Sequence, residues 1–235
     1  MKPLLVIKNV THEGPGLLEG ILRDRVMTHE VVDLARGEKF PAPANYRGLV
    51  VLGGPDSAND RTEKMATELM RTRECIDQEI PYLGICLGLQ VLVKAAGGGV
   101  VKSPLKEVGF REPDGKRFKV DLTGEGKADP LFDGLSDGFE VFQLHGETVR
   151  LTESMTLLAG GRHCRDQVVR VGTNAYGIQC HFELTREMLE VWASTDKDLR
   201  VLDKQKLLAD FDAFSEIYTK TGKRLLENFL DKVIP

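Results

Sequence analysis

The 235-residue sequence lacks the features that mark membrane, secreted or nucleic-acid-binding proteins. No apolar run approaches the roughly 18 residues that a membrane-spanning helix needs, so we expect no membrane span. The apolar run Leu4–Val10 is short and has no small-residue cleavage pattern after it, so we interpret it as a strand and not as a signal peptide. Basic residues are not in excess, because the net charge is −4. This balance argues against a nucleic-acid partner.

Cysteine is also scarce, and no C-x-x-C pair occurs. The four cysteines, Cys75, Cys86, Cys164 and Cys180, lie far apart. Such usage is typical of a reduced, cytoplasmic protein and not of a disulfide scaffold. The pair His163-Cys164 lacks companions for a metal site, so we expect no metal. Cys75 is expected to be packed or idle within a helix.

Alternating strands and helices over the first hundred residues predict an α/β fold with right-handed βαβ units and a parallel sheet. The expected strands are Leu4–Val10, His29–Leu34, Leu49–Leu52 and Tyr82–Ile85. Helical spacing begins at Leu17 and recurs over Thr62–Ile80 and Leu89–Ala96. Ligands of such sheets bind beyond the carboxyl ends of the strands, where Gly54 and Cys86 fall.

From Val100 onward the pattern changes to short strands separated by Gly and Asp turns, which predicts an antiparallel edge layer. These strands are Phe118–Leu122, Phe139–Leu144, Met155–Ala159, Val168–Val171 and Ala175–His181, and the last is expected to return to the main sheet. We place no domain boundary: a core over about 4–183 carries a helical extension over about 185–235. Its apolar residues, among them Leu202 and Ile217, recur at helical spacing, so the extension could cover the sheet or carry a homodimer contact.

The segment Gly84-Ile85-Cys86-Leu87-Gly88 has the strand–turn–helix pattern of a nucleophile elbow, G-x-C-x-G. A turn this tight crowds neighbouring side chains, which explains the flanking glycines. The turn would place the Cys86 thiol at a helix N-terminus, where the thiolate is favoured. The alternative is a buried structural cysteine in a glycine-rich turn.

A thiol nucleophile needs a base, and the base needs an orienting group. His181 and Glu183 stand two residues apart at the end of an expected strand, so their side chains share a face. The sequence therefore predicts a Cys86–His181–Glu183 triad, with Cys180 buried on the opposite face. His145 is a rival base, and a lone strand-end histidine is the structural alternative for His181.

Donors for an oxyanion are expected from the backbone N–H groups of Leu87, in the elbow, and Gly54, in Gly53-Gly54-Pro55. Taken alone, the Gly-Gly-Pro segment also fits an ordinary turn.

With Gly-Ile-Cys-Leu-Gly-Leu-Gln and Gln-Cys-His-Phe-Glu in place, the chain resembles class I (triad-type) glutamine amidotransferases from about Leu4 to Glu183. The resemblance implies a flavodoxin-like three-layer α/β/α fold with a mainly parallel sheet. It implies catalytic roles for Cys86, His181 and Glu183, and an oxyanion hole at Gly54 and Leu87. It also implies that Gln90 helps to hold glutamine and that the backbone at Gln143, Leu144 and His145 binds its amino-acid end. The family usually has Pro where this chain has Phe182, which we expect to alter the pocket rim.

The resemblance implies hydrolysis of the glutamine side-chain amide through a cysteine thioester, without a metal or organic cofactor. Its segment pattern is similar to stand-alone relatives of the amidotransferase part of GMP synthase. No G-x-x-x-x-G-K-[ST] loop occurs, so a separate synthetase is expected to consume the ammonia. Two other functions stay open: a stand-alone hydrolase of γ-glutamyl amides or peptides, and a catalytically silent regulatory or binding subunit.

Overall fold

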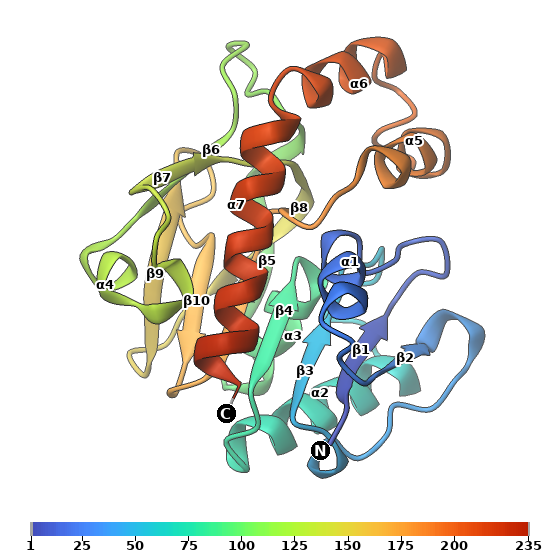
Figure 1. Cartoon of the computed structure of the whole chain (residues 1–235), viewed down its shortest axis with the longest axis vertical. Helices are drawn as coiled ribbons and strands as arrows, with labels where there is room; N and C mark the ends of the chain where they lie inside the picture. Colours follow the sequence, from blue (N-terminus) through green and yellow to red (C-terminus); the bar gives the residue numbers. More distant parts are fainter. Residues whose placement is uncertain (1, 235) are drawn as a thin grey trace.

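A nine-stranded sheet runs through the centre of the computed structural model, which describes residues 2–234 (Figure 1). The first five strands in spatial order are parallel: β2 (His29–Asp33), β1 (Leu4–Lys8), β3 (Gly48–Val51), β4 (Tyr82–Ile85) and β11 (Ala175–Ile178). The next four are antiparallel: β10 (Val168–Val171), β9 (Met155–Gly161), β6 (Lys119–Leu122) and β7 (Gly138–Glu140). The α/β class is thereby confirmed, and the last strand returns beside β4 as expected.

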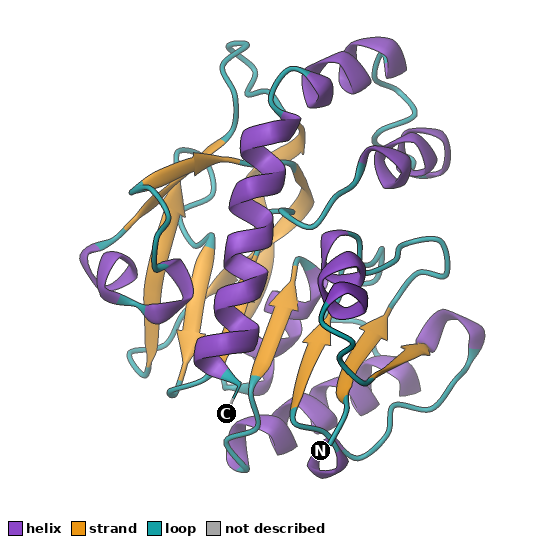
Figure 2. Ribbon diagram, viewed as in Figure 1, coloured by secondary structure: helices purple, strands orange, loops and turns teal. Residues whose placement is uncertain are grey.

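Helices cover both faces of this sheet and make it the middle of three layers (Figure 2). Helices α1 (Leu17–Asp24) and α7 (Ser215–Asn228) cover one face, and α2 (Glu63–Asp77) and α3 (Leu87–Ala95) cover the other. Strand β1 shows why the parallel strands read as continuous apolar runs. Leu4 and Val6 pack toward α1 and α7, whereas Leu5 and Ile7 pack toward α2 and α3. Both faces of the strand are buried, so no polar alternation remains.

A second, two-stranded antiparallel sheet joins β5 (Gly99–Gly109) to β8 (Gln143–Arg150). Helices α5 (Arg186–Thr195) and α6 (Lys204–Asp212) share a third apolar cluster with this part of the chain, around Phe110, Phe142 and Trp192. The shorter helical segments are α4 (Gly124–Ala128), η1 (Leu34–Arg36), η2 (Pro43–Asn45), η3 (Pro130–Phe132) and η4 (Phe229–Val233).

In this region one sequence-based prediction was wrong, and one strand was missed. The expected strand Phe139–Leu144 is divided between β7 and β8, which belong to different sheets. No strand was expected at β5, because it holds Lys102, Pro104, Lys106 and Glu107 and has no apolar run. Its register shifts between Lys102 and Glu107, where the pairing with β8 is interrupted.

The C-terminal extension covers the sheet, since Leu225, Leu226 and Phe229 pack in the core beside α1. The homodimer contact stays a prediction. Leu202 and Ile217, which share the helical spacing of the buried residues, are instead 38% and 63% exposed. Leu202 falls in the turn before α6, and Ile217 lies on the solvent side of α7.

All four cysteines are free, and Cys75 and Cys180 pack in the apolar core as expected. Among residues 2–234, no helix is both long and apolar enough to cross a bilayer.

Candidate active site

Cys86 forms the turn between β4 and α3 and adopts φ 53° and ψ −103°. Two close approaches explain the neighbouring glycines. A Cβ on Gly84 would lie 2.3 Å from the backbone of Gly88, and one on Gly88 would lie 2.3 Å from the carbonyl oxygen of Val51. Only glycine fits at both positions. The turn holds the Cys86 thiol at the first turn of α3, where unpaired N–H groups and the helix dipole favour negative charge.

His181 and Glu183 lie beyond the end of β11, in irregular backbone and not in the regular strand that was expected. Two backbone hydrogen bonds anchor the segment, because His181 N donates to Phe142 O (2.8 Å) and Phe142 N donates to His181 O (3.3 Å). His181 Nδ1 lies 2.6 Å from Glu183 Oε1. The ring also interacts with the Cys86 side chain, and both residues line the same cavity. The structure thus brings all three predicted triad residues together.

The charge state of His181 follows from these contacts. Burial lowers the pKa of its imidazole, but the charge of Glu183 and the hydrogen bonds to Cys86 and Glu183 outweigh burial. The pKa of His181 is therefore raised well above its usual value, so the ring readily holds a second proton.

Gly54 and Leu87, the predicted oxyanion donors, line the same cavity as Cys86. They lie side by side, since a Cβ on Gly54 would be 3.3 Å from Leu87 Cδ2 and 2.6 Å from Asn9 Cβ. The Nδ2 atom of Asn9 donates to Leu52 O at 3.3 Å and to Glu68 Oε2 at 3.2 Å. This buried pair supports the loop that carries Gly54.

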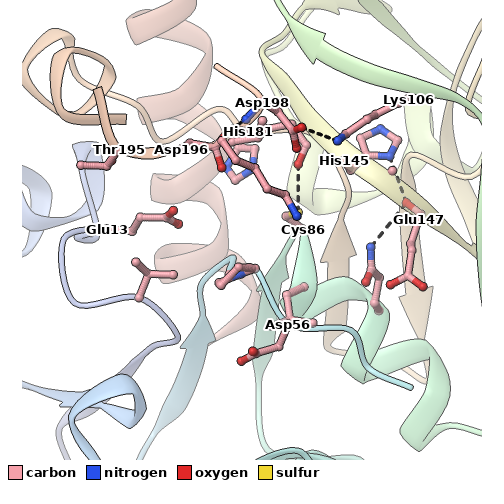
Figure 3. Close-up of a pocket in the computed structure, with 18 of the residues that line it drawn as sticks. Glu13, Asp56, Cys86, Lys106, His145, Glu147, His181, Thr195, Asp196 and Asp198 are labelled. Carbon is pink, nitrogen blue, oxygen red and sulfur yellow. Dashed lines mark hydrogen bonds and ion pairs between the residues drawn. The ribbon is translucent and has the colours of Figure 1, made fainter. Parts of the chain in front are cut away.

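The cavity above Cys86 has a volume of about 760 Å³ (Figure 3). One wall comes from β5 and β8, with Lys106, His145 and Glu147, and another comes from the segment after α5, with Asp196 and Asp198. Lys106 Nζ and Asp198 Oδ1 join these walls through a 2.5 Å ion pair.

Glu13 lies on the opposite side of Cys86 from His145 (Figure 3). Burial raises the pKa of its carboxyl to about 7, and the charges of Glu183 and Asp196 add to the rise while those of His181 and Lys8 oppose it. This acidic side chain reaches the site from the loop after β1.

A family model for "Glutamine amidotransferase class-I" matches residues 21–190 of the chain. The chain belongs to the class I glutamine amidotransferase family. Members of this family are glutamine-hydrolysing cysteine enzymes.

Relatives and solved structures agree with this assignment. The chain is 34% identical over 160 residues to the glutamine amidotransferase-like protein YfeJ of Salmonella typhimurium, covering 66% of this chain and 64% of that protein. It is 31% identical over 149 residues to the GMP synthase [glutamine-hydrolyzing] of Ectopseudomonas mendocina, covering 59% of this chain and 26% of that protein. The crystal structure of a glutamine amido transferase from Methylobacillus flagellatus superposes with a TM-score of 0.86 at 26% identity, covering 99% and 96% of the two chains. This chain therefore spans less than two thirds of the YfeJ protein and about a quarter of the GMP synthase.

The residues predicted to bind substrate in this amidotransferase fall in two places. Gln90, Leu144 and His145 line the cavity, whereas Gln143 is 1% exposed and is not among the described residues that line it. Phe182 does not alter the pocket rim, because its side chain is buried in the core against α1 and α7. That expectation was wrong.

His145, the rival to His181 as the base, has no ring nitrogen available for the Cys86 thiol. Its Nδ1 lies 3.0 Å from Glu147 O, which can only accept, so Nδ1 carries a proton. Its Nε2 lies 2.8 Å from Glu107 Oε2, and both side chains are buried. Both ring nitrogens are occupied by partners other than the cysteine.

Cys164 has companions after all, but they are Glu107 and His145 and not His163. The ligand atoms of these three buried residues lie within 4.8 Å of one another. Burial raises the pKa of the Cys164 thiol to about 11, and its Sγ lies 3.2 Å from Thr148 Oγ1. The group thus consists of the Glu107–His145 pair with the Cys164 thiol beside it.

Sequence reasoning missed Glu13, the Asn9–Glu68 pair, Gln179 and the wall at Asp196–Asp198. For Glu13 a signal existed, since it follows the carboxyl end of the first strand. Asp196 and Asp198 reach the cavity only because α5 packs beside β8, which no local pattern reveals.

Proposed function

We propose that this chain hydrolyses the side-chain amide of L-glutamine to glutamate and ammonia through a thioester on Cys86. One observation carries the proposal: His181 and Cys86 line the same cavity and interact there, while Nδ1 of the ring lies 2.6 Å from Glu183 Oε1. A nucleophile, a base and an orienting carboxylate in that order are the requirements of acyl transfer. The same contacts argue against a catalytically silent subunit.

In the first half-reaction the Cys86 thiolate attacks the amide carbon of glutamine. The carbonyl oxygen becomes an oxyanion that accepts hydrogen bonds from the N–H groups of Leu87 and Gly54. The protonated ring of His181 donates its proton to the amide nitrogen, so that ammonia leaves and the glutamyl thioester remains. Glu183 holds the ring through Nδ1 and stabilises its charge.

In the second half-reaction water attacks the thioester carbon. His181, now neutral, takes a proton from the water, and the oxyanion rests on the same two N–H groups. Collapse of the tetrahedral intermediate breaks the carbon–sulfur bond, releases glutamate and restores the Cys86 thiolate.

The direct test is glutamate release from L-glutamine by the purified chain, with Cys86→Ala and Cys86→Ser beside it. We expect both variants to lose turnover, while Cys75→Ala, which removes a core thiol remote from the cavity, keeps it. A Cys86→Ala protein that still released glutamate would contradict the proposal.

We further propose that the ammonia serves a separate synthetase. The support is the similarity to GMP synthases, of which this chain matches only about a quarter. If no glutamate is released by the chain alone, adding the candidate synthetase should restore release that depends on Cys86.

The cavity favours a second candidate, hydrolysis of γ-glutamyl amides or peptides. Its 760 Å³ is within the range of pockets for drug-sized ligands, roughly 300–1,000 Å³, and glutamine is far smaller than those ligands. Comparison of kcat/KM for glutamine with that for a panel of γ-glutamyl amides and dipeptides separates the two candidates.

A further inference from the structure

Gln179 lies against the sulfur of Cys86 and has no role in the chemistry described above. It is fully buried, one residue beyond β11, and its backbone N–H donates to Gln167 O at 2.8 Å. Its side-chain Nε2 lies 3.6 Å from Cys86 Sγ, a hydrogen-bond distance for a sulfur acceptor. Its Oε1 accepts a hydrogen bond from Gln90 Nε2 at 3.4 Å.

The orientation of the Gln179 amide is fixed by a backbone carbonyl. Gln90 Nε2 also lies 3.4 Å from Glu147 O, which can only accept a hydrogen bond. The nitrogen of Gln90 must therefore face Glu147 and Gln179, so the atom of Gln179 beside it is the oxygen. The nitrogen of Gln179 is left to face the sulfur.

The surroundings of the sulfur differ for its two protonation states. As a thiol, Cys86 donates to Leu144 O at 3.8 Å. As a thiolate it has no proton for that carbonyl, whereas Gln179 Nε2 can still donate to the sulfur and the His181 ring interacts with it. Hydrogen bonds donated to a charged group favour the charged form.

We propose that Gln179 is a catalytic residue that stabilises the Cys86 thiolate through Nε2, and that Gln90 is the positioning residue that orients it. The inference rests on the proposed role of Cys86 as nucleophile. It also changes the expected role of Gln90: both of its amide hydrogens are directed to Glu147 and Gln179, so only its Oε1 is left for a substrate.

Alkylation of Cys86 by iodoacetamide, followed by mass spectrometry across a pH series, measures the thiolate without needing glutamine. Cys86 lines the cavity, whereas the other three cysteines are at most 1% exposed, and burial raises the pKa of each. In Gln179→Glu the Oε1 contact with Gln90 is kept but an oxygen faces the sulfur. In Gln179→Leu the donor is lost.

We expect both variants to move the alkylation midpoint upward by about one pH unit or more, which slows the reaction about tenfold at pH values below the midpoint. Gln90→Leu should shift the midpoint in the same direction by less, because the Gln179 amide is then free to turn. The matched control is Gln167→Leu, since Gln167 is equally buried but donates to Glu107 and not to Cys86. Its midpoint should equal that of the wild type.

An unchanged midpoint in Gln179→Glu and Gln179→Leu would overturn the inference. Should neither variant fold, the wild type itself provides the test: the side-chain amide signals of Gln179 in ¹⁵N NMR spectra must move with the ionisation of Cys86 and must not move in Cys86→Ala. Static signals would also overturn it. A wild type in which Cys86 is alkylated no faster than the other cysteines would instead contradict the proposed function.

Discussion

The Oε1 atom of Glu183 lies 2.6 Å from Nδ1 of His181, and each side chain is only 3% exposed. The second oxygen of Glu183 accepts the backbone N–H of Phe182 at 2.9 Å. With both oxygens engaged, the carboxylate cannot turn away from the ring. The position of the imidazole toward Cys86 is therefore set by the backbone of its own segment.

We expect Glu183→Gln to lower kcat for glutamate release by roughly 10²- to 10⁴-fold, the range for loss of effective acid–base catalysis. The charge that stabilises the imidazolium is lost, while nucleophile and base remain. Steady-state kinetics with glutamine measures this, and Glu216→Gln, an exposed carboxylate at the start of α7, is the control. Equal kcat in Glu183→Gln and wild type would show that another group orients His181.

The raised pKa of His181 predicts a pH dependence that NMR can follow. The imidazole should lose its proton well above the usual value of about 6.5, and Glu183→Gln should lower that midpoint. Between 6.5 and the folded value the native state binds more protons than the unfolded state. The contribution of His181 to stability is therefore present below pH 6.5 and is lost as the pH rises through the folded value. An unshifted titration of His181 would contradict this account.

The elbow predicts a sharp contrast between glycines. Gly84→Ala and Gly88→Ala should fail to fold or lose all turnover, because their Cβ atoms would lie 2.3 Å from backbone atoms. Gly20→Ala is the matched control, since it lies inside α1 and its nearest neighbour would be a side-chain atom of Arg23 at 4.0 Å. It should stabilise the chain by about 0.5–1 kcal/mol. Urea unfolding of the three variants measures the difference.

Local patterns predicted the parallel half of the fold because its strands are buried on both faces, as Leu4 to Ile7 show. The β5 strand escaped prediction because Lys102, Lys106 and Glu107 belong to a two-stranded sheet beside the cavity, where polar residues are tolerated.

The candidate site likewise has residues that the sequence predicted and a contact that it did not reveal. Cys86, His181 and Glu183 sit in short motifs, so their spacing could be read directly. Gln179 stands two residues before His181, and the alternation that relates His181 to Glu183 includes it as well. Its contact with Cys86 joins segments 93 residues apart, so only the structure shows it.

Glu68 should make the stability of the chain fall as the pH rises. Burial raises the pKa of this fully buried carboxyl from 4.5 to about 7, so the folded state holds a proton that the unfolded state releases. At pH 8 the wild type should lose about 3 kcal/mol relative to pH 4 through this group. Glu68→Gln keeps the shape without the charge and should be the more stable protein at pH 8. Urea unfolding at both pH values tests this, with the exposed Glu63→Gln as the control. If the free energy of unfolding changed equally between pH 4 and pH 8 in Glu68→Gln and in the wild type, the prediction would be contradicted.

Phe182 should not be replaceable by Pro in this chain, although related amidotransferases usually carry Pro at this position. Its backbone N–H donates to Glu183 Oε2, and its side chain is 2% exposed in the core. Phe182→Pro removes the N–H as well as the ring, so we expect a loss of stability on the order of 3 kcal/mol and a lower kcat, because Glu183 is released. Phe182→Leu keeps the N–H and should lose less stability while retaining kcat. Urea unfolding and glutaminase kinetics on the two variants separate the contributions: if Pro and Leu gave the same kcat, the backbone hydrogen bond would have no part in holding Glu183 toward His181.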